Sequence, residues 1–365
     1  MELLYGGFIL FVCALLALDL GVFHRKLHVI GVREALGWSG FWIGLGASFA
    51  AFVWVGYEHR WFGLGTTVDA MVTPTLAADG TVIYNDGASA AIKYLTGFVV
   101  EKSLAIDNLF VIAMIFASFR IPAIYQHRVL FWGILGALVM RGAMIALGAA
   151  LITNVSWIIY VFGGFLIVTG LKMLLIADQP HNLGVHAVVR LMRRIIPITE
   201  HNHGSRFFVR AGTPASLAPA VAGGPAERDG VVEAARRGAL LATPLFMALV
   251  LIEIADLVFA VDSIPAIFAI TTDPFLVFTS NVFAILGMRS LYFALAGMIE
   301  RFRYLKVALA CVLLVVGVKM LAHGWLKSVL GAGFNFYVLG IIAAILAAGV
   351  VASILVNNRD RRSLL

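Results

Sequence analysis

Residues 244–269 read PLFMALVLIEIADLVFAVDSIPAIFA, an apolar run that contains Glu253, Asp256 and Asp262. About 20 apolar residues in a helix cross a hydrocarbon core of about 30 Å, and the run lacks the alternation of barrel strands. A charged group at the bilayer centre costs about 2.5 to 3.5 kcal/mol on insertion scales, so intramembrane acids are kept for a function or a partner. The stretch predicts a transmembrane helix whose acidic residues have a function or a partner.

The rest of the chain agrees with a membrane protein. Of its 365 residues, 61% are hydrophobic and 13% are charged, which does not suit a water-soluble chain. Apolar runs predict nine transmembrane spans, at about 3–23, 39–56, 93–118, 129–150, 154–177, 242–269, 275–297, 304–323 and 335–356.

The basic residues predict the orientation. Nineteen Lys and Arg lie in segments 24–38, 119–128, 178–241, 298–306 and 357–365, against two in the alternate segments. Because cytoplasmic loops carry the excess of Lys and Arg, the N-terminus is predicted outside and the C-terminus in the cytoplasm. The net charge of +7 is then a topology signal, and no nucleic-acid partner is expected.

Two halves of the chain resemble each other. Asp107-Asn108 aligns with Asp262-Ser263, Arg141 with Arg289, and Gly170-Leu-Lys172 with Gly317-Val-Lys319, at offsets of 155, 148 and 147 residues. A three-span unit repeated directly must enter the membrane from opposite sides, as in many secondary transporters. The predicted fold is an all-α polytopic membrane protein of about nine transmembrane helices that contains an inverted repeat of two three-helix units.

This fold divides the chain into six parts. Two N-terminal transmembrane helices (1–56) precede an extracytoplasmic loop (57–92) with hairpin signals and the first repeat (93–177). A basic cytoplasmic loop (178–241) follows, in which 211–225 has the composition of a disordered linker. The second repeat (242–323) leads to the C-terminal transmembrane helix and cytoplasmic tail (324–365).

The intramembrane polar residues predict a metal site. Carboxylate, amide and hydroxyl oxygens without His or Cys suit hard divalent ions such as Mn²⁺, Mg²⁺ or Ca²⁺. Glu253 has no acidic counterpart in the first copy, where Phe98 stands, and is the candidate for exchanging a proton against metal. The predicted ligands are Glu101, Asp107, Asn108, Glu253, Asp256, Asp262 and Ser263.

A structural reading of the same acids stays open. Lys102, Arg141 and Arg289 could neutralise them in buried pairs or act in gating. Five acids against three bases leave about two negative charges for a cation or protons. Thr279, Ser280 and Asn281 could line the path or tie helices together.

Three long motifs resemble the TerC family, in particular its Alx branch. They are Glu101-Lys-Ser-Leu-Ala-Ile-Asp107-Asn108, Asp256-Leu-Val-Phe-Ala-Val-Asp262-Ser263-Ile-Pro265 and Thr279-Ser-Asn281-Val-Phe-Ala-Ile-Leu-Gly-Met-Arg289. The resemblance covers nearly the whole chain. It implies a multi-pass protein of the bacterial inner membrane associated with Mn²⁺ export, with tellurite resistance and alkaline pH response as further labels, and it implies that the seven predicted ligands form the metal path.

The expected function is export of a divalent cation, most of all Mn²⁺, through a carboxylate-lined site between the inverted repeats, with proton coupling as an option. The expected partners are the ion and the bilayer. No cofactor and no enzymatic activity are expected, and the number of subunits is left open. An intramembrane hydrolase would use paired aspartates, but the chain lacks the Gly-x-Gly-Asp element of such proteases. The other alternative is a redox-modulating or tellurite-resistance partner protein without transport activity.

Overall fold

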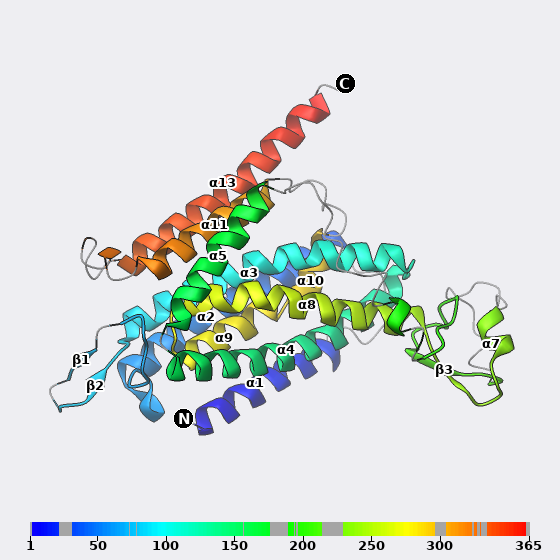
Figure 1. Cartoon of the computed structure of the whole chain (residues 1–365), viewed down its shortest axis with the longest axis horizontal. Coiled ribbons are helices and arrows are strands. Elements are labelled where there is room, and N and C mark those ends of the chain that lie inside the picture. The colour runs from blue at the N-terminus through cyan, green and yellow to red at the C-terminus, as the bar shows by residue number, and fades with distance from the viewer. Residues whose placement is uncertain are drawn as a thin grey trace. The chain divides into compact units, whose positions relative to one another are not determined.

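Helices dominate the computed structural model of the chain (Figure 1). It describes residues 2–21, 31–72, 74–77, 79–155, 157–175, 189–192, 194, 196–213, 229–295, 304–322, 325, 326, 329 and 334–362. Side chains are described for most of these residues. Those of Asp107 and Asp262, among a few others, lie outside the description.

Each predicted span coincides with helix in the described chain. The helices are α1 (Glu2–Gly21), α2 (Val32–Glu58), α3 (Gly87–Ser118), α4 (Ala123–Asn154), α5 (Ile158–Leu175), α8 (Pro244–Phe268), α9 (Pro274–Ile285), α10 (Met288–Leu295), α11 (Leu305–Leu321) and α13 (Phe334–Arg362). A short 3₁₀ turn, Trp61–Gly63, follows α2. The apolar runs therefore located the helices, with ends that differ by up to seven residues, the most at the start of α2 (Val32 against 39).

Length and hydropathy alone support fewer membrane spans than nine. Within the described residues, four helices are long and apolar enough to cross a bilayer, and the bent pair α9–α10 would be a fifth. α3 is 32 residues long but contains Lys93, Glu101, Lys102 and Asp107. The apolar parts of α1, α11 and α13 are shorter. The count of nine spans stays a prediction.

The predicted span 275–297 is broken, which the sequence analysis did not foresee. α9 ends at Ile285 and α10 starts at Met288, with a bend of 40° between them. Gly287 has a φ of +79°, a left-handed conformation that glycine adopts without penalty. A Cβ at this glycine would overlap Trp42 of α2, so the break fits only glycine.

The two long loops contain short strands. In the loop 57–92, β1 (Thr75–Leu76) pairs antiparallel with β2 (Val82–Ile83), so the predicted hairpin is present. In and next to the loop 178–241, β3 (Phe208–Arg210) pairs with β4 (Leu240–Ala242) beside a short helix, α7 (Gly230–Ala234). These elements lie outside the predicted linker 211–225, and no sequence pattern had indicated them. Their apolar residues form a small core, and residues 214–225 of the predicted linker lie outside the described residues.

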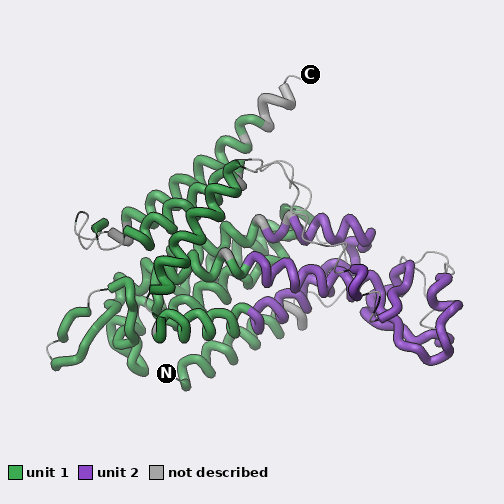
Figure 2. Tube along the Cα trace, viewed as in Figure 1, with its two compact units in different colours: residues 1–107, 141–177, 260–365 green, residues 108–140, 178–259 purple. Residues whose placement is uncertain are grey.

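The chain divides into two compact units (Figure 2). Unit 1 contains residues 1–107, 141–177 and 260–365, and unit 2 contains 108–140 and 178–259. In unit 1, α5 packs against α11, and α11 packs against α13. The core of that group includes Leu166, Val312 and Val316.

Glycines bring α5 and α11 close together. A Cβ on Gly163 would lie 3.4 Å from the carbonyl oxygen of Gly317, and a Cβ on Gly170 would lie 2.9 Å from that of Ala310. Small residues at such a crossing allow two backbones to approach, as is common between membrane helices.

Candidate functional site

The two predicted metal motifs meet at one contact within unit 2. The amide nitrogen of Asn108 on α3 donates a hydrogen bond to Asp256 on α8 over 3.3 Å. Glu253 lies three residues before Asp256 and therefore on the same face of α8. The structure thus brings together three of the predicted oxygen ligands.

The carboxylate of Glu253 lies directly against Gly136 of α4. A Cβ on Gly136 would overlap the carboxylate oxygens, so α4 makes room for this acid only because the residue is glycine. The Oε2 atom of Glu253 is buried and has no hydrogen-bond partner among the described residues. A buried carboxylate oxygen without a partner is costly, and a cation or a proton would satisfy it. No pattern in the sequence points to Gly136.

Within unit 1, Glu101 of α3 forms an ion pair with Arg141 of α4. Both side chains are buried, at 1% and 2% exposure. Arg141 also donates to the side-chain oxygen of Asn281 on α9 over 3.1 Å. The structural reading therefore holds for Glu101, whose charge is compensated by an arginine as it stands. Buried pairs of this kind are costly to break, because one uncompensated charge is left behind.

Lys102, the next residue on α3, contacts the break between α9 and α10. Its ammonium donates to the carbonyl oxygens of Ala284 and Leu286 over 2.9 and 3.0 Å. Among the described residues it forms no ion pair with a carboxylate. Its role in charge pairing or gating stays a prediction, because the side chains of Asp107 and Asp262 lie outside the described part of the structure.

The other predicted residues have varied positions. Ser263 is buried and its hydroxyl has no hydrogen-bond partner among the described residues. Thr279 and Ser280 are buried and donate to carbonyl oxygens of their own helix. Arg289 is buried on α10. The side chains of Asp107 and Asp262 lie outside the described part of the structure, so their roles as ligands stay predictions.

Among the described residues, no three His, Cys, Asp or Glu side chains are arranged to hold a metal ion. The described oxygen donors consist of two acids and an amide, Glu253, Asp256 and Asn108.

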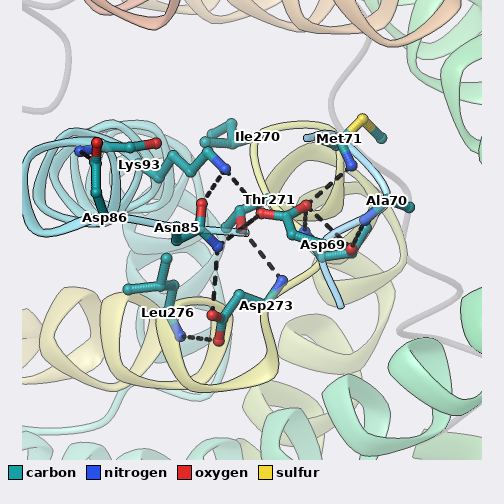
Figure 3. A network of polar contacts seen from close by, with 12 residues as sticks. Asp69, Ala70, Met71, Asn85, Asp86, Lys93, Ile270, Thr271, Asp273 and Leu276 are labelled. Carbon is teal, nitrogen blue, oxygen red and sulfur yellow. Dashed lines mark hydrogen bonds and ion pairs between the residues drawn. The ribbon is translucent and has the colours of Figure 1, made fainter. Parts of the chain in front are cut away.

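A second polar cluster, also in unit 1, was missed by the sequence analysis (Figure 3). Asp69 of the loop 57–92 accepts hydrogen bonds from Lys93 over 2.8 Å and from the hydroxyl of Thr271 over 2.5 Å. Lys93 also donates to Asn85, which in turn donates to Asp273. We call Tyr57, Asp69, Asn85, Lys93, Thr271, Thr272 and Asp273 the loop network.

The loop network is buried and well satisfied. Lys93 is 1% exposed. The Asp69 carboxylate also accepts from the amide nitrogens of Met71 and Thr272. Tyr57 of α2 donates to Asp273, which caps the N-terminus of α9 just before Pro274. Fully satisfied buried networks fix a local structure, so this one fastens the loop 57–92 to α3 and to the α8–α9 turn.

The two aspartates of the loop network differ in electrostatics. Burial alone would raise the pKa of Asp69, but the Lys93 ammonium and several hydrogen bonds hold it well below its usual range. Burial, together with the negative charge of Asp69, raises the pKa of Asp273 to about 6. Asp273 is therefore the carboxylate of this network that can take up a proton in a mildly acidic medium.

Known proteins match the chain over most of its length. Residues 86–361 match the family described as "Integral membrane protein TerC family". The chain is 46% identical to an "Uncharacterized membrane protein STKORF319" of Myxococcus xanthus, over 96% of this chain and 92% of the relative. It is 40% and 38% identical to proteins named "Putative membrane-bound redox modulator Alx" in Photorhabdus laumondii and in Escherichia coli K12, over 98% of this chain and 96% of each relative. No solved structure matches it.

Proposed function

Because the chain belongs to the TerC family of integral membrane proteins, we propose that it exports a divalent metal cation, most of all Mn²⁺, by means of the carboxylates on α3 and α8. The observation that carries this proposal is the Glu253 carboxylate, which lies against Gly136 with an oxygen that lacks a described partner, one helical turn from Asp256. The proposed location is the bacterial inner membrane, with the N-terminus outside and the C-terminus in the cytoplasm.

Charge supports a cation as the cargo. Glu101 has Arg141 as its partner, whereas the Oε2 atom of Glu253 has no hydrogen-bond partner among the described residues. Asp256 adds a second carboxylate on the same face of α8. Acids in a transmembrane helix need compensation, and a divalent ion would supply it. Oxygen ligands alone favour Mn²⁺ and Mg²⁺ over Zn²⁺ or Cu²⁺.

The crossing of α5 and α11 supports the inverted repeat on which the proposal relies. At the repeat offset of 147 residues, Gly163 corresponds to Ala310 and Gly170 corresponds to Gly317. The contact of Gly163 with Gly317 therefore has an exact counterpart in the contact of Gly170 with Ala310. Two copies related by a two-fold axis make such reciprocal contacts, and inverted repeats of this kind occur in carriers that alternate between two sides of a membrane.

The test is Mn²⁺ flux in proteoliposomes that contain the purified protein. Wild-type protein is expected to move Mn²⁺ but not Zn²⁺, and Asp107→Asn or Asp262→Asn is expected to abolish the flux while leaving the protein in the membrane. Asp79→Asn, at an exposed acid of the outer loop, is the matched control. Unchanged Mn²⁺ flux in both variants would assign these two acids to ion pairing.

Glu253 is the proposed site of proton exchange. If metal entry expels a proton from this acid, Mn²⁺ binding strengthens as the pH rises, and Glu253→Gln removes that dependence. Mn²⁺ binding measured between about pH 6 and 9 tests this. Binding by the wild type that does not depend on pH would contradict proton coupling.

The name of the Alx relatives suggests the second candidate function, a redox-modulating membrane protein without transport. The same proteoliposomes decide between the two. Absence of flux for Mn²⁺, Mg²⁺ and Ca²⁺ by correctly inserted wild-type protein would favour the redox role.

A further inference from the structure

The break between α9 and α10 exposes carbonyl oxygens that a helix would normally use. The last four carbonyl groups of any helix lack partners within it, and Ala284 lies in the last turn of α9. Leu286 is extended, with φ −57° and ψ 132°, so its carbonyl points away from the helical direction. Two main-chain oxygens are therefore available at one point in a helix pair that is apolar enough to be a span.

A positive charge occupies this point. The Lys102 ammonium lies 2.9 Å from the oxygen of Ala284 and 3.0 Å from that of Leu286. Glu101, the neighbouring acid on α3, is paired with Arg141. The Lys102 ammonium thus donates to neutral carbonyl groups, although acidic residues lie close to it in the sequence.

The break itself is fixed by packing on α2. A side chain at Gly287 would overlap Trp42, and the serine after the break, Ser290, is hydrogen-bonded to Ser39 of α2 over 3.3 Å. The carbonyl pair is therefore a permanent feature of unit 1, and Lys102 is the described group that satisfies it.

In carriers with broken helices, such carbonyl groups coordinate the Na⁺ or H⁺ that drives transport. We propose that Lys102 is a tethered monovalent cation that fills the position of a coupling Na⁺, so that this carrier works without Na⁺ and acquires a Na⁺ site when the ammonium is removed. The expected effect on Mn²⁺ flux rests on the proposed transport function. The expected effect on Na⁺ binding does not depend on that function.

The binding experiment uses the purified full-length chain and radioactive Na⁺. Lys102→Ala is expected to bind Na⁺ saturably, whereas the wild type and Lys102→Arg are expected to bind none. Lys172→Ala is the matched control, because Lys172 is an exposed lysine in the last turn of α5. If Lys102→Ala does not insert, Lys102→Met, which keeps an unbranched side chain but has no donor for the carbonyl pair, takes its place with the same expected result.

The transport experiment compares Mn²⁺ uptake in buffers that contain Na⁺ or N-methylglucamine as the monovalent cation. The wild type is expected to be equally active in both. Lys102→Ala is expected to be about tenfold slower without Na⁺, the equivalent of losing one hydrogen bond to a charged group, and to recover with Na⁺ or methylammonium.

The outcomes separate the two proposals. If Lys102→Ala binds no Na⁺ and its flux is the same with or without Na⁺ or methylammonium, the tethered-cation proposal is wrong and Lys102 has only a structural role. If the wild type moves no Mn²⁺ but Lys102→Ala gains Na⁺ binding, the transport function is wrong and the cation site stands.

Discussion

Replacing Lys93 with methionine would remove the positive charge of the loop network and leave the Asp69 carboxylate buried. Breaking a buried ion pair on one side costs about 3 to 5 kcal/mol. Asp69 retains hydrogen-bond donors from Met71, Asn85, Thr271 and Thr272, so the lower value, about 3 kcal/mol, applies. Opening of the loop 57–92 is therefore expected to become more frequent by roughly a hundredfold.

Hydrogen exchange measures this opening directly. The amide of Tyr84 donates to the carbonyl oxygen of Gly65, and the amide of Ala70 donates to Thr272, so both report whether the loop is closed. In Lys93→Met these amides are expected to exchange roughly a hundred times faster than in the wild type. In the double variant Lys93→Met/Asp69→Asn, much of the protection against exchange is expected to return, because the uncompensated negative charge of Asp69 is gone.

The exposed pair of Arg60 and Asp79, at 2.8 Å in the same loop, provides the control. Arg60→Ala is expected to leave the exchange rates nearly unchanged, since exposed pairs contribute little. Exchange at the wild-type rate in Lys93→Met, or faster exchange in the double variant than in the single one, would refute the reasoning.

Three further predictions concern topology, the site and pH. Cysteines introduced within 79–87 are expected to react only from outside, and those within 211–225 only from the cytoplasm; labelling of both from one side would end the inverted-repeat argument. Gly136→Ala is expected to displace the Glu253 carboxylate and to weaken Mn²⁺ binding, measured by titration, about tenfold. Gly142→Ala on the same helix is the control and is expected to leave Mn²⁺ binding unchanged, because its Cβ would only touch Phe278 at 3.5 Å. Since the folded protein holds the proton of Asp273 more tightly than the unfolded chain does, thermal stability is expected to fall as the pH rises from about 4 to about 6; Asp273→Asn, which can still cap α9, should remove this change, and a wild-type stability that rises over the same range would contradict the assignment.

The sequence predicted part of the polar site. Acids in apolar helices are conspicuous, and the motif alignment pointed to contact between the two copies, which Asn108 and Asp256 of unit 2 make. It did not predict the partner of each charge. Glu101 pairs with Arg141, but Lys102 binds main-chain carbonyls, because those oxygens become available only where the α9–α10 break places them.

The loop network was hidden from sequence analysis for a related reason. Asp69 lies within the loop 57–92 and Lys93 in the first turns of α3, and charged residues of these kinds are mostly exposed. The group that buries them includes Thr271, 202 residues away from Asp69. No local pattern records a hydrogen bond across such a distance.

The sequence by itself determined where the helices lie, because the length and composition of an apolar run decide whether it can satisfy its backbone within a membrane. It also determined which residues would be costly there, such as Glu101 and Glu253. Tertiary structure alone decided which groups compensate them, that Gly136 makes room for Glu253, and that Gly287 breaks a span against Trp42. These depend on the distances between surfaces of different helices, and such distances are fixed only when the helices pack together.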